Sequence, residues 1–85
     1  MVTFTHVIQD PLGLHARPAG MLAKTAAGFR SAITITAPSG TADVKRIMAV
    51  MRLSAKQGQE LTFAITGDDE ETAADTLKTF LKDNL

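Results

Sequence analysis

The stretch "VTFTHVIQDPLGLHARPAGMLAKTAAG", residues 2–28, changes the spacing of its apolar residues part-way along and so decides the fold class. Residues 2–8 alternate in part and are rich in β-branched side chains, which predicts a strand ended by Asp10-Pro11 and Gly13. Residues 16–27 repeat apolar side chains at helical spacing, and we expect Gly28 to stop this helix as a left-handed cap. One face of the predicted strand carries Val2, Phe4, His6 and Ile8, and the core stripe of the predicted helix is Ala19, Leu22, Ala23 and Ala26.

The rest of the chain continues to mix strands and helices. "SAITITA" (31–37) and "TADV" (41–44) predict a hairpin across the turn "PSG", and "LTFAIT" (61–66) predicts a fourth strand. "RIMAVMRL" (46–53) predicts a short helix, and "DDEETAADTLKTFLKDN" (68–84) predicts a longer one capped by Asp68 or Asp69. The core stripe of that last helix is Ala73, Leu77, Phe80 and Leu81. This order predicts a single α+β domain over residues 1–85, with a four-stranded, mostly antiparallel sheet covered on one face by three helices.

Composition narrows the classes of function. The 85 residues carry a formal net charge of zero and contain no cysteine, tyrosine or tryptophan. The charge balance and the missing aromatic platforms disfavour nucleic-acid binding, and the lack of cysteine removes disulfides and thiolate chemistry, so we expect no metal and no cofactor. Apolar runs are short, and the N-terminus shows no basic segment followed by an apolar one. We therefore expect no membrane insertion, no signal peptide and a cytoplasmic location.

His15 stands immediately before the predicted first helix, in "GLHARPAG", residues 13–20. Pro18 fits the opening turn, where backbone N–H groups lack intrahelical acceptors and, with the helix dipole, favour an anion. Arg17 adds a planar cation that suits phosphate oxygens. Because both features are positive, they disfavour the imidazolium, and we expect a neutral ring able to attack phosphorus and to be held as phosphohistidine. The alternative is a histidine that only fills a surface turn.

The segment "GLHARPAG" resembles the active-site segment of the HPr family, the histidine phosphocarriers of the bacterial phosphoenolpyruvate–sugar phosphotransferase system. "VKRIMAVMRLSAKQGQELTFAITGDDEETAADTL" (44–77) is similar to that family's second helix, final strand and third helix, so the resemblance covers essentially the whole chain. It implies an open-faced β-sandwich and a carrier that is a substrate of its partners rather than an enzyme. It also implies that His15 takes a phosphoryl group from phospho-enzyme I on Nδ1 and passes it to IIA domains of sugar permeases. Arg17 and the N–H groups of Ala16 and Arg17 would then stabilise the phosphate.

A docking patch for partner proteins is expected on the two helix faces near His15. In residues 16–27 the core stripe leaves Gly20 and Met21 projecting away from it, and in residues 46–53 Val50 and Leu53 are the expected core residues. The two helices carry more apolar residues than the core requires, and the surplus predicts an exposed docking patch. Methionine side chains adapt to partners of different shape. The alternative is that the methionines fill a small core. The predicted patch and its basic rim comprise Gly20, Met21, Lys24, Lys45, Arg46, Ile47, Met48, Met51 and Arg52. We expect a monomer that presents this face to successive partners.

Two residues depart from the pattern that the resemblance implies. Arg46 stands where many family members carry a serine that a regulatory kinase phosphorylates, and arginine cannot accept that phosphate. No other hydroxyl residue occupies the matching position, so we expect no regulatory serine. Leu12 stands where a polar residue is common, and a side-chain hydrogen bond to the phosphate is lost there.

His6 and the acidic run "GDDEE" (67–71) are expected to be structural. His6 lies mid-strand without ligand-type side chains at metal spacing, while helix capping and dipole compensation account for the acidic residues. Two other classes of function stay open on the residues alone. One is a regulatory module that docks a partner without phosphoryl transfer, and the other is a small α+β nucleic-acid binder. The sequence identifies neither the sugars nor the permeases served.

Overall fold

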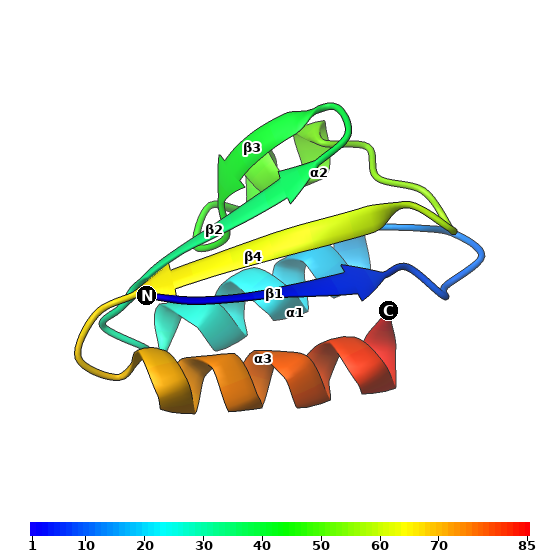
Figure 1. Ribbon diagram of the computed structural model, residues 1–85. Coiled ribbons are helices and arrows are strands. Elements are labelled where there is room, and N and C mark those ends of the chain that lie inside the picture. The colour runs from blue at the N-terminus through cyan, green and yellow to red at the C-terminus, as the bar shows by residue number, and fades with distance from the viewer.

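The computed structural model describes all of residues 1–85 as two layers, a sheet and three helices on one of its faces (Figure 1). The strands are β1 (Val2–Val7), β2 (Ala32–Ala37), β3 (Gly40–Asp43) and β4 (Glu60–Thr66). The helices are α1 (Ala16–Ala27), α2 (Ile47–Arg52) and α3 (Glu70–Asn84). The predicted order of strands and helices and the α+β class are confirmed.

The four strands form one sheet in the order β1-β4-β2-β3, and every neighbouring pair is antiparallel. Side chains alternate between the two faces of a strand, so each strand sends one set of residues towards the helices and the other set outward. Ile33, Ile35 and Phe63 are fully buried on the helix side, and Phe4 stacks on Phe63 with ring centroids 5.1 Å apart. The outward face is rich in threonine and stays open to solvent.

The core between the two layers unites all three helices with the sheet. The predicted stripe of α1 is buried throughout, whereas on α3 Ala74 is buried and Phe80 lies only at the margin of the core. Helix α2 has six residues, too few to be stable alone, so its position depends on packing. Val50 and Leu53 supply that packing, as predicted, and thereby fix the surface that α2 presents.

Two helix ends differ from the prediction. Gly28 has φ −75° and is right-handed, so it is not a left-handed cap; α1 ends instead with the Gly28 N–H donating to the Thr25 carbonyl. Asp69 is the first residue before α3, but its carboxylate caps no N–H of that helix. A tertiary contact takes the carboxylate away, because it reaches the segment that joins α1 to β2.

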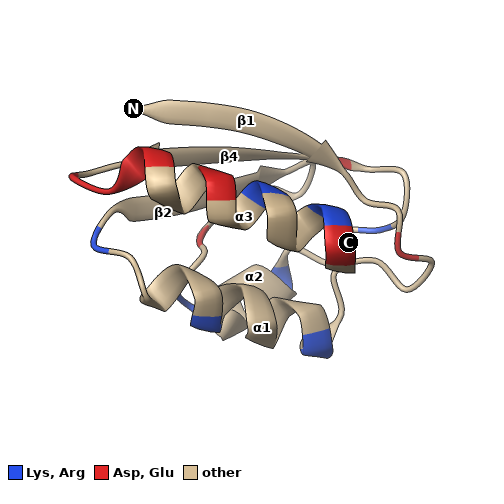
Figure 2. Ribbon diagram, turned by 90° about the horizontal axis from the view of Figure 1, so that it is seen from below, with Lys and Arg blue, Asp and Glu red and all other residues tan.

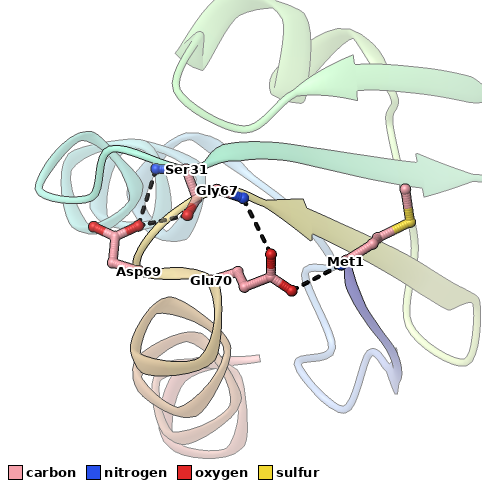
Figure 3. Close-up of polar contacts among 5 residues, drawn as sticks. All are labelled: Met1, Ser31, Gly67, Asp69 and Glu70. Atoms are coloured by element: carbon pink, nitrogen blue, oxygen red, sulfur yellow. Dashed lines mark hydrogen bonds and ion pairs between the residues drawn. The ribbon is translucent and has the colours of Figure 1, made fainter.

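The carboxylate of Asp69 fastens the start of α3 to Ser31, as Figure 3 shows, and to the neighbouring Arg30. One oxygen accepts hydrogen bonds from the N–H and hydroxyl of Ser31, at 3.0 and 2.5 Å, and the other accepts from the N–H of Arg30 at 2.9 Å. Glu70 accepts from the Gly67 N–H and pairs with the Met1 ammonium at 2.8 Å. The first turn of α3 is therefore anchored mainly by bonds to distant parts of the chain, residues 30–31 and Met1.

Acid should weaken this anchor. The Ser31 hydroxyl, followed by the N–H groups of Arg30 and Ser31, holds the pKa of Asp69 below its ordinary 3.8. A lowered folded pKa contributes stability that is complete above 3.8 and is lost as pH falls through the folded value. We expect the urea midpoint of Asp69→Asn to fall less steeply than that of the parent between about pH 5 and pH 2. Asp68→Asn, at an exposed neighbour, should keep the parental slope, and equal slopes for all three proteins would contradict this account.

Candidate functional site

The loop before α1 is folded so that His15 emerges at its end. Gly13 has φ +69°, and its N–H donates to the Asp10 carbonyl at 2.9 Å, which closes a tight turn. Leu14 is buried, and its N–H donates to the carbonyl of Ala55 at 2.9 Å. His15 then has extended backbone, φ −88° and ψ −177°, directly before α1. The predicted place of His15 at the helix start is confirmed.

The first N–H groups of α1 have no acceptor within the protein. The first helical bond runs from the Ala19 N–H to the His15 carbonyl at 3.0 Å, so the N–H groups of Ala16 and Arg17 stay free. Pro18 is buried in the first turn and has no N–H to offer. The imidazole of His15 does not cap the helix either. An anion placed here meets two free backbone donors at the positive end of the helix dipole.

The side chains of the loop, of α1 and of the end of α3 surround one hollow of about 370 Å³ beside His15. The guanidinium of Arg17 forms no ion pair or hydrogen bond with the protein and is available to a ligand. The N–H groups of Gln9 and Asp10 donate to the Leu85 carbonyl, which joins the end of α3 to the loop. The residues around the hollow are Asp10, Leu12, His15, Arg17, Pro18, Met21, Asp83 and Asn84.

Sequence reasoning does not find three residues of this site, Asp10, Asp83 and Asn84, and of these Asp10 is the one that faces the His15 ring. Its Oδ2 lies 3.7 Å from Nε2 of His15, and its Oδ1 accepts from the Leu12 N–H at 2.8 Å. The surroundings of the ring therefore include a carboxylate as well as the two positive features that the sequence predicts, the helix end and Arg17. A carboxylate five residues before a histidine, across a turn that contains glycine, is the signal in the sequence, but the strand pattern uses Asp10 only as a strand end.

Helix α2 lies beside α1 and extends the site with an apolar surface. A Cβ on Gly20 would come 3.2 Å from Cδ1 of Ile47, so the glycine allows the two helices to approach. Met21, Ile47 and Met48 are 39%, 41% and 61% exposed and form what we call the apolar patch. Met51 differs from the expectation of a free side chain, because it is half-buried against the core below.

Positive charge gathers around the apolar patch. Figure 2 shows Lys and Arg but no Asp or Glu on α1, where Lys24 is exposed beyond Arg17. Arg46 and Arg52 are exposed and border a second hollow of about 520 Å³ over α2. Lys45 is not free, since its ammonium donates to the Phe29 carbonyl at 2.8 Å. Arg46 directly precedes α2 and makes no side-chain cap.

Two further observations concern other kinds of site. No cluster of three or more His, Asp or Glu side chains is arranged to hold a metal ion, and none of the helices has the length and apolar character that crossing a bilayer requires. His6 is half-buried in β1, and its Nε2 is buried without a hydrogen-bond partner.

Residues 2–83 match the family model described as the PTS HPr component phosphorylation site. The chain belongs to the HPr family. It is 42% identical to the phosphocarrier protein HPr of Lysinibacillus sphaericus over 81 residues, which cover 95% of this chain and 92% of that protein. It is 40% identical to HPr of Mycoplasma genitalium over 85 residues, with 99% and 97% covered.

Solved structures of HPr proteins share the fold. The histidine-containing phosphocarrier protein of a Mycoplasma superposes with a TM-score of 0.93 at 41% identity, covering 96% of this chain and 93% of the other. Crh of Bacillus subtilis, a catabolite-repression protein solved as a domain-swapped dimer, gives 0.76 at 28% identity, with 100% and 98% covered. The predicted four-stranded open-faced sandwich is confirmed, and this HPr family member is a phosphocarrier of the phosphotransferase system.

Proposed function

We propose that this HPr family member accepts a phosphoryl group from phospho-enzyme I on Nδ1 of His15 and passes it to IIA domains of sugar permeases. The observation that carries the proposal is the meeting of three features at the start of α1, beside one open hollow. These are the imidazole of His15, the two free N–H groups of Ala16 and Arg17, and the unpaired guanidinium of Arg17. We further propose a monomeric, single-domain carrier in the cytoplasm.

The same features favour both uptake and release of the group. The lone pair of an imidazole nitrogen attacks phosphorus, and the new phosphate meets the backbone donors and the guanidinium. A helix-end contact is worth only about 0.3–1 kcal/mol at an exposed site, so the phosphate is held without being trapped. With its side chain 35% exposed, His15 is accessible to the donor and to the acceptor in turn. On this proposal the chain is a substrate of its partner proteins and catalyses no reaction by itself.

The relay can be tested with purified components. Labelled phosphoenolpyruvate and enzyme I should load this chain, and a IIA domain added afterwards should remove the label from it. His15→Gln should keep its fold and take up no label. A regulatory docking module without phosphoryl transfer would instead bind enzyme I or the IIA domain and remain unlabelled, and that outcome would contradict the proposal.

We propose that partners dock on the apolar patch and its basic rim. The proposed contact residues are Gly20, Met21, Lys24, Arg46, Ile47, Met48, Met51 and Arg52. Met48 is the most exposed of the apolar ones, so it can contact a partner without loosening the core. The cations around it suit a partner face that carries acidic residues.

Met48→Asp tests this docking surface. We expect the KM for enzyme I to rise about tenfold, because the change removes a buried contact in the complex and opposes acidic partner groups. The maximal rate should change little, since Met48 lies outside the hollow around His15. Thr34→Asp, an equivalent change on the open face of the sheet, is the control and should leave KM unaltered. Equal KM values for the two variants would refute docking at this surface.

We propose that this chain is not a substrate of a serine-directed HPr kinase. Arg46 stands at the position where many HPr proteins carry the serine that such a kinase phosphorylates. Arginine has no hydroxyl group to phosphorylate. Its side chain does not cap α2, and a cation directly before a helix is mildly unfavourable, so the fold does not depend on Arg46. Arg46→Ser should therefore fold normally and become the only one of the two proteins that such a kinase can phosphorylate on residue 46.

A further inference from the structure

The two nitrogens of the His15 ring have different surroundings. Nε2 lies 3.7 Å from the carboxylate oxygen Oδ2 of Asp10, whereas Nδ1 takes part in no hydrogen bond or ion pair of the protein. A neutral imidazole carries its single proton on one nitrogen and has a reactive lone pair only on the other. Whatever fixes the proton therefore decides which nitrogen attacks phosphorus.

Asp10 is held in place by three bonds that leave Oδ2 free. Its N–H donates to the Leu85 carbonyl at 3.1 Å, and its carbonyl accepts from the Gly13 N–H at 2.9 Å. Its Oδ1 accepts from the Leu12 N–H at 2.8 Å. The remaining oxygen, Oδ2, accepts no hydrogen bond, and Nε2 of His15 is the one ionisable nitrogen within 4 Å of it. A carboxylate fixed in this way presents a constant negative charge to one edge of the imidazole.

We propose that Asp10 is a positioning residue that keeps the proton on Nε2 of His15 and directs the phosphoryl group to Nδ1. The inference rests on the proposed function of His15. An anionic carboxylate favours an N–H at the nitrogen that faces it and repels an anionic phosphoryl group approaching the same nitrogen. Both effects leave Nδ1 as the nucleophile. The arrangement parallels the aspartate of a catalytic triad, which orients a histidine and fixes its tautomer without taking part in bond formation.

In the transfer step one bond to phosphorus forms and another breaks, while the proton on Nε2 of His15 stays in place. The Nδ1 lone pair forms the N–P bond while the bond between phosphorus and the donor atom of phospho-enzyme I breaks, and the electron pair of that bond stays with the donor. The ring of His15 becomes positively charged, with the proton still on Nε2. The Asp10 carboxylate faces that positive ring, and the reverse sequence delivers the group to the acceptor. Asp10 itself neither gains nor loses a proton and forms no covalent bond.

The separation in the free protein is compatible with this role. At 3.7 Å the pair is longer than a hydrogen bond, and a movement of about 0.7 Å brings it to the ordinary N–H···O length of about 3.0 Å. Contacts of this kind often tighten only when the reacting partner is bound. Both side chains are partly exposed, at 35% for His15 and 26% for Asp10, which leaves room for the adjustment.

The tautomer of His15 can be measured in the unphosphorylated protein, and no activity is needed. Ring ¹⁵N shifts at about pH 8.5, well above the ordinary histidine pKa of about 6.5, should show the proton on Nε2 in the parent. In Asp10→Asn the amide oxygen can still accept from the Leu12 N–H, and the amide nitrogen becomes a donor towards Nε2. We expect the proton to move largely to Nδ1 in that variant. Asp83→Asn removes a carboxylate from the same hollow without touching His15, and should keep the parental tautomer.

Transfer kinetics supply the second readout. Asp10→Asn should slow phosphoryl uptake about five- to tenfold, the effect of one net hydrogen bond, and should shift part of the phosphate to Nε2. Asp10→Glu, which keeps the charge, should restore most of the Nδ1 product. A parent with its proton on Nδ1, or an Asp10→Asn protein with unchanged tautomer and product, would overturn the inference while leaving phosphorylation of His15 intact. Failure of the parent to be phosphorylated at all would instead defeat the proposed function.

Discussion

Arg17→Ala is expected to slow phosphoryl transfer to His15 about a hundredfold, the lower end of what removal of one preorganised donor from a developing anion costs. The guanidinium forms no hydrogen bond or ion pair with the protein, so its removal breaks no such bond and should leave the fold unaltered. Its loss removes the only full positive charge in the hollow. The backbone donors of Ala16 and Arg17 remain, which is why a slow residual transfer should persist.

Single-turnover quench-flow with saturating phospho-enzyme I measures this rate without the docking step. The transfer rate of Arg17→Lys should lie between those of the parent and Arg17→Ala, since an ammonium supplies charge but not the planar pair of donors that fits a phosphate. Arg30→Ala is the matched control, because Arg30 is exposed outside the hollow. If Arg17→Ala transferred as fast as Arg30→Ala, the guanidinium would have no part in holding the phosphate.

Gly13→Ala is expected to lower the free energy of unfolding by about 3 kcal/mol, a large share of the 5–15 kcal/mol typical of small proteins. The left-handed backbone, φ +69°, costs an L-residue about 1–2 kcal/mol. The new Cβ would also stand 2.5 Å from the carbonyl oxygen of Ala55 and 2.9 Å from Cα of Lys56. Those atoms are main chain and cannot rotate away, so overpacking adds about 1–3 kcal/mol.

Gly58→Ala separates the two contributions to that loss. Gly58 has φ +88° and open space where the Cβ of an alanine would stand, so it should lose only the conformational part, about 1–2 kcal/mol. Urea unfolding gives both values. The Gly13 variant should also shift the amide resonances of Leu14 and His15, because relief of the clash moves the loop that carries them. Equal losses at the two glycines would show that the close approach to Ala55 is not a constraint.

The period of the apolar residues is enough to predict the layers of this fold. Alternation in residues 61–66 and helical spacing in residues 16–27 are local properties, and burial of Phe63 and Leu22 follows directly from them. His15 before Pro18 can be placed at a helix start for a similar reason, since the restrictions on proline act within one turn.

The rest depends on distant parts of the chain. Asp69 has the pattern of a helix cap, yet three hydrogen bonds to residues 30–31 draw its carboxylate elsewhere. Met51 shares a short helix with Met48, and only the depth of the core beneath α2 decides that one is half-buried and the other exposed. Asp10 meets His15 through the turn at Gly13 and through the bond from the Asp10 N–H to the distant Leu85 carbonyl, so the five-residue spacing alone does not establish the contact.

Locating the phosphate after exposure to enzyme I and phosphoenolpyruvate tests the central claim most directly. We predict one acid-labile, alkali-stable phosphoryl group per chain, bonded to Nδ1 of His15, and none on His15→Ala. A phosphate on His6 or on a hydroxyl side chain, or an equal amount on the His15→Ala protein, would contradict the account.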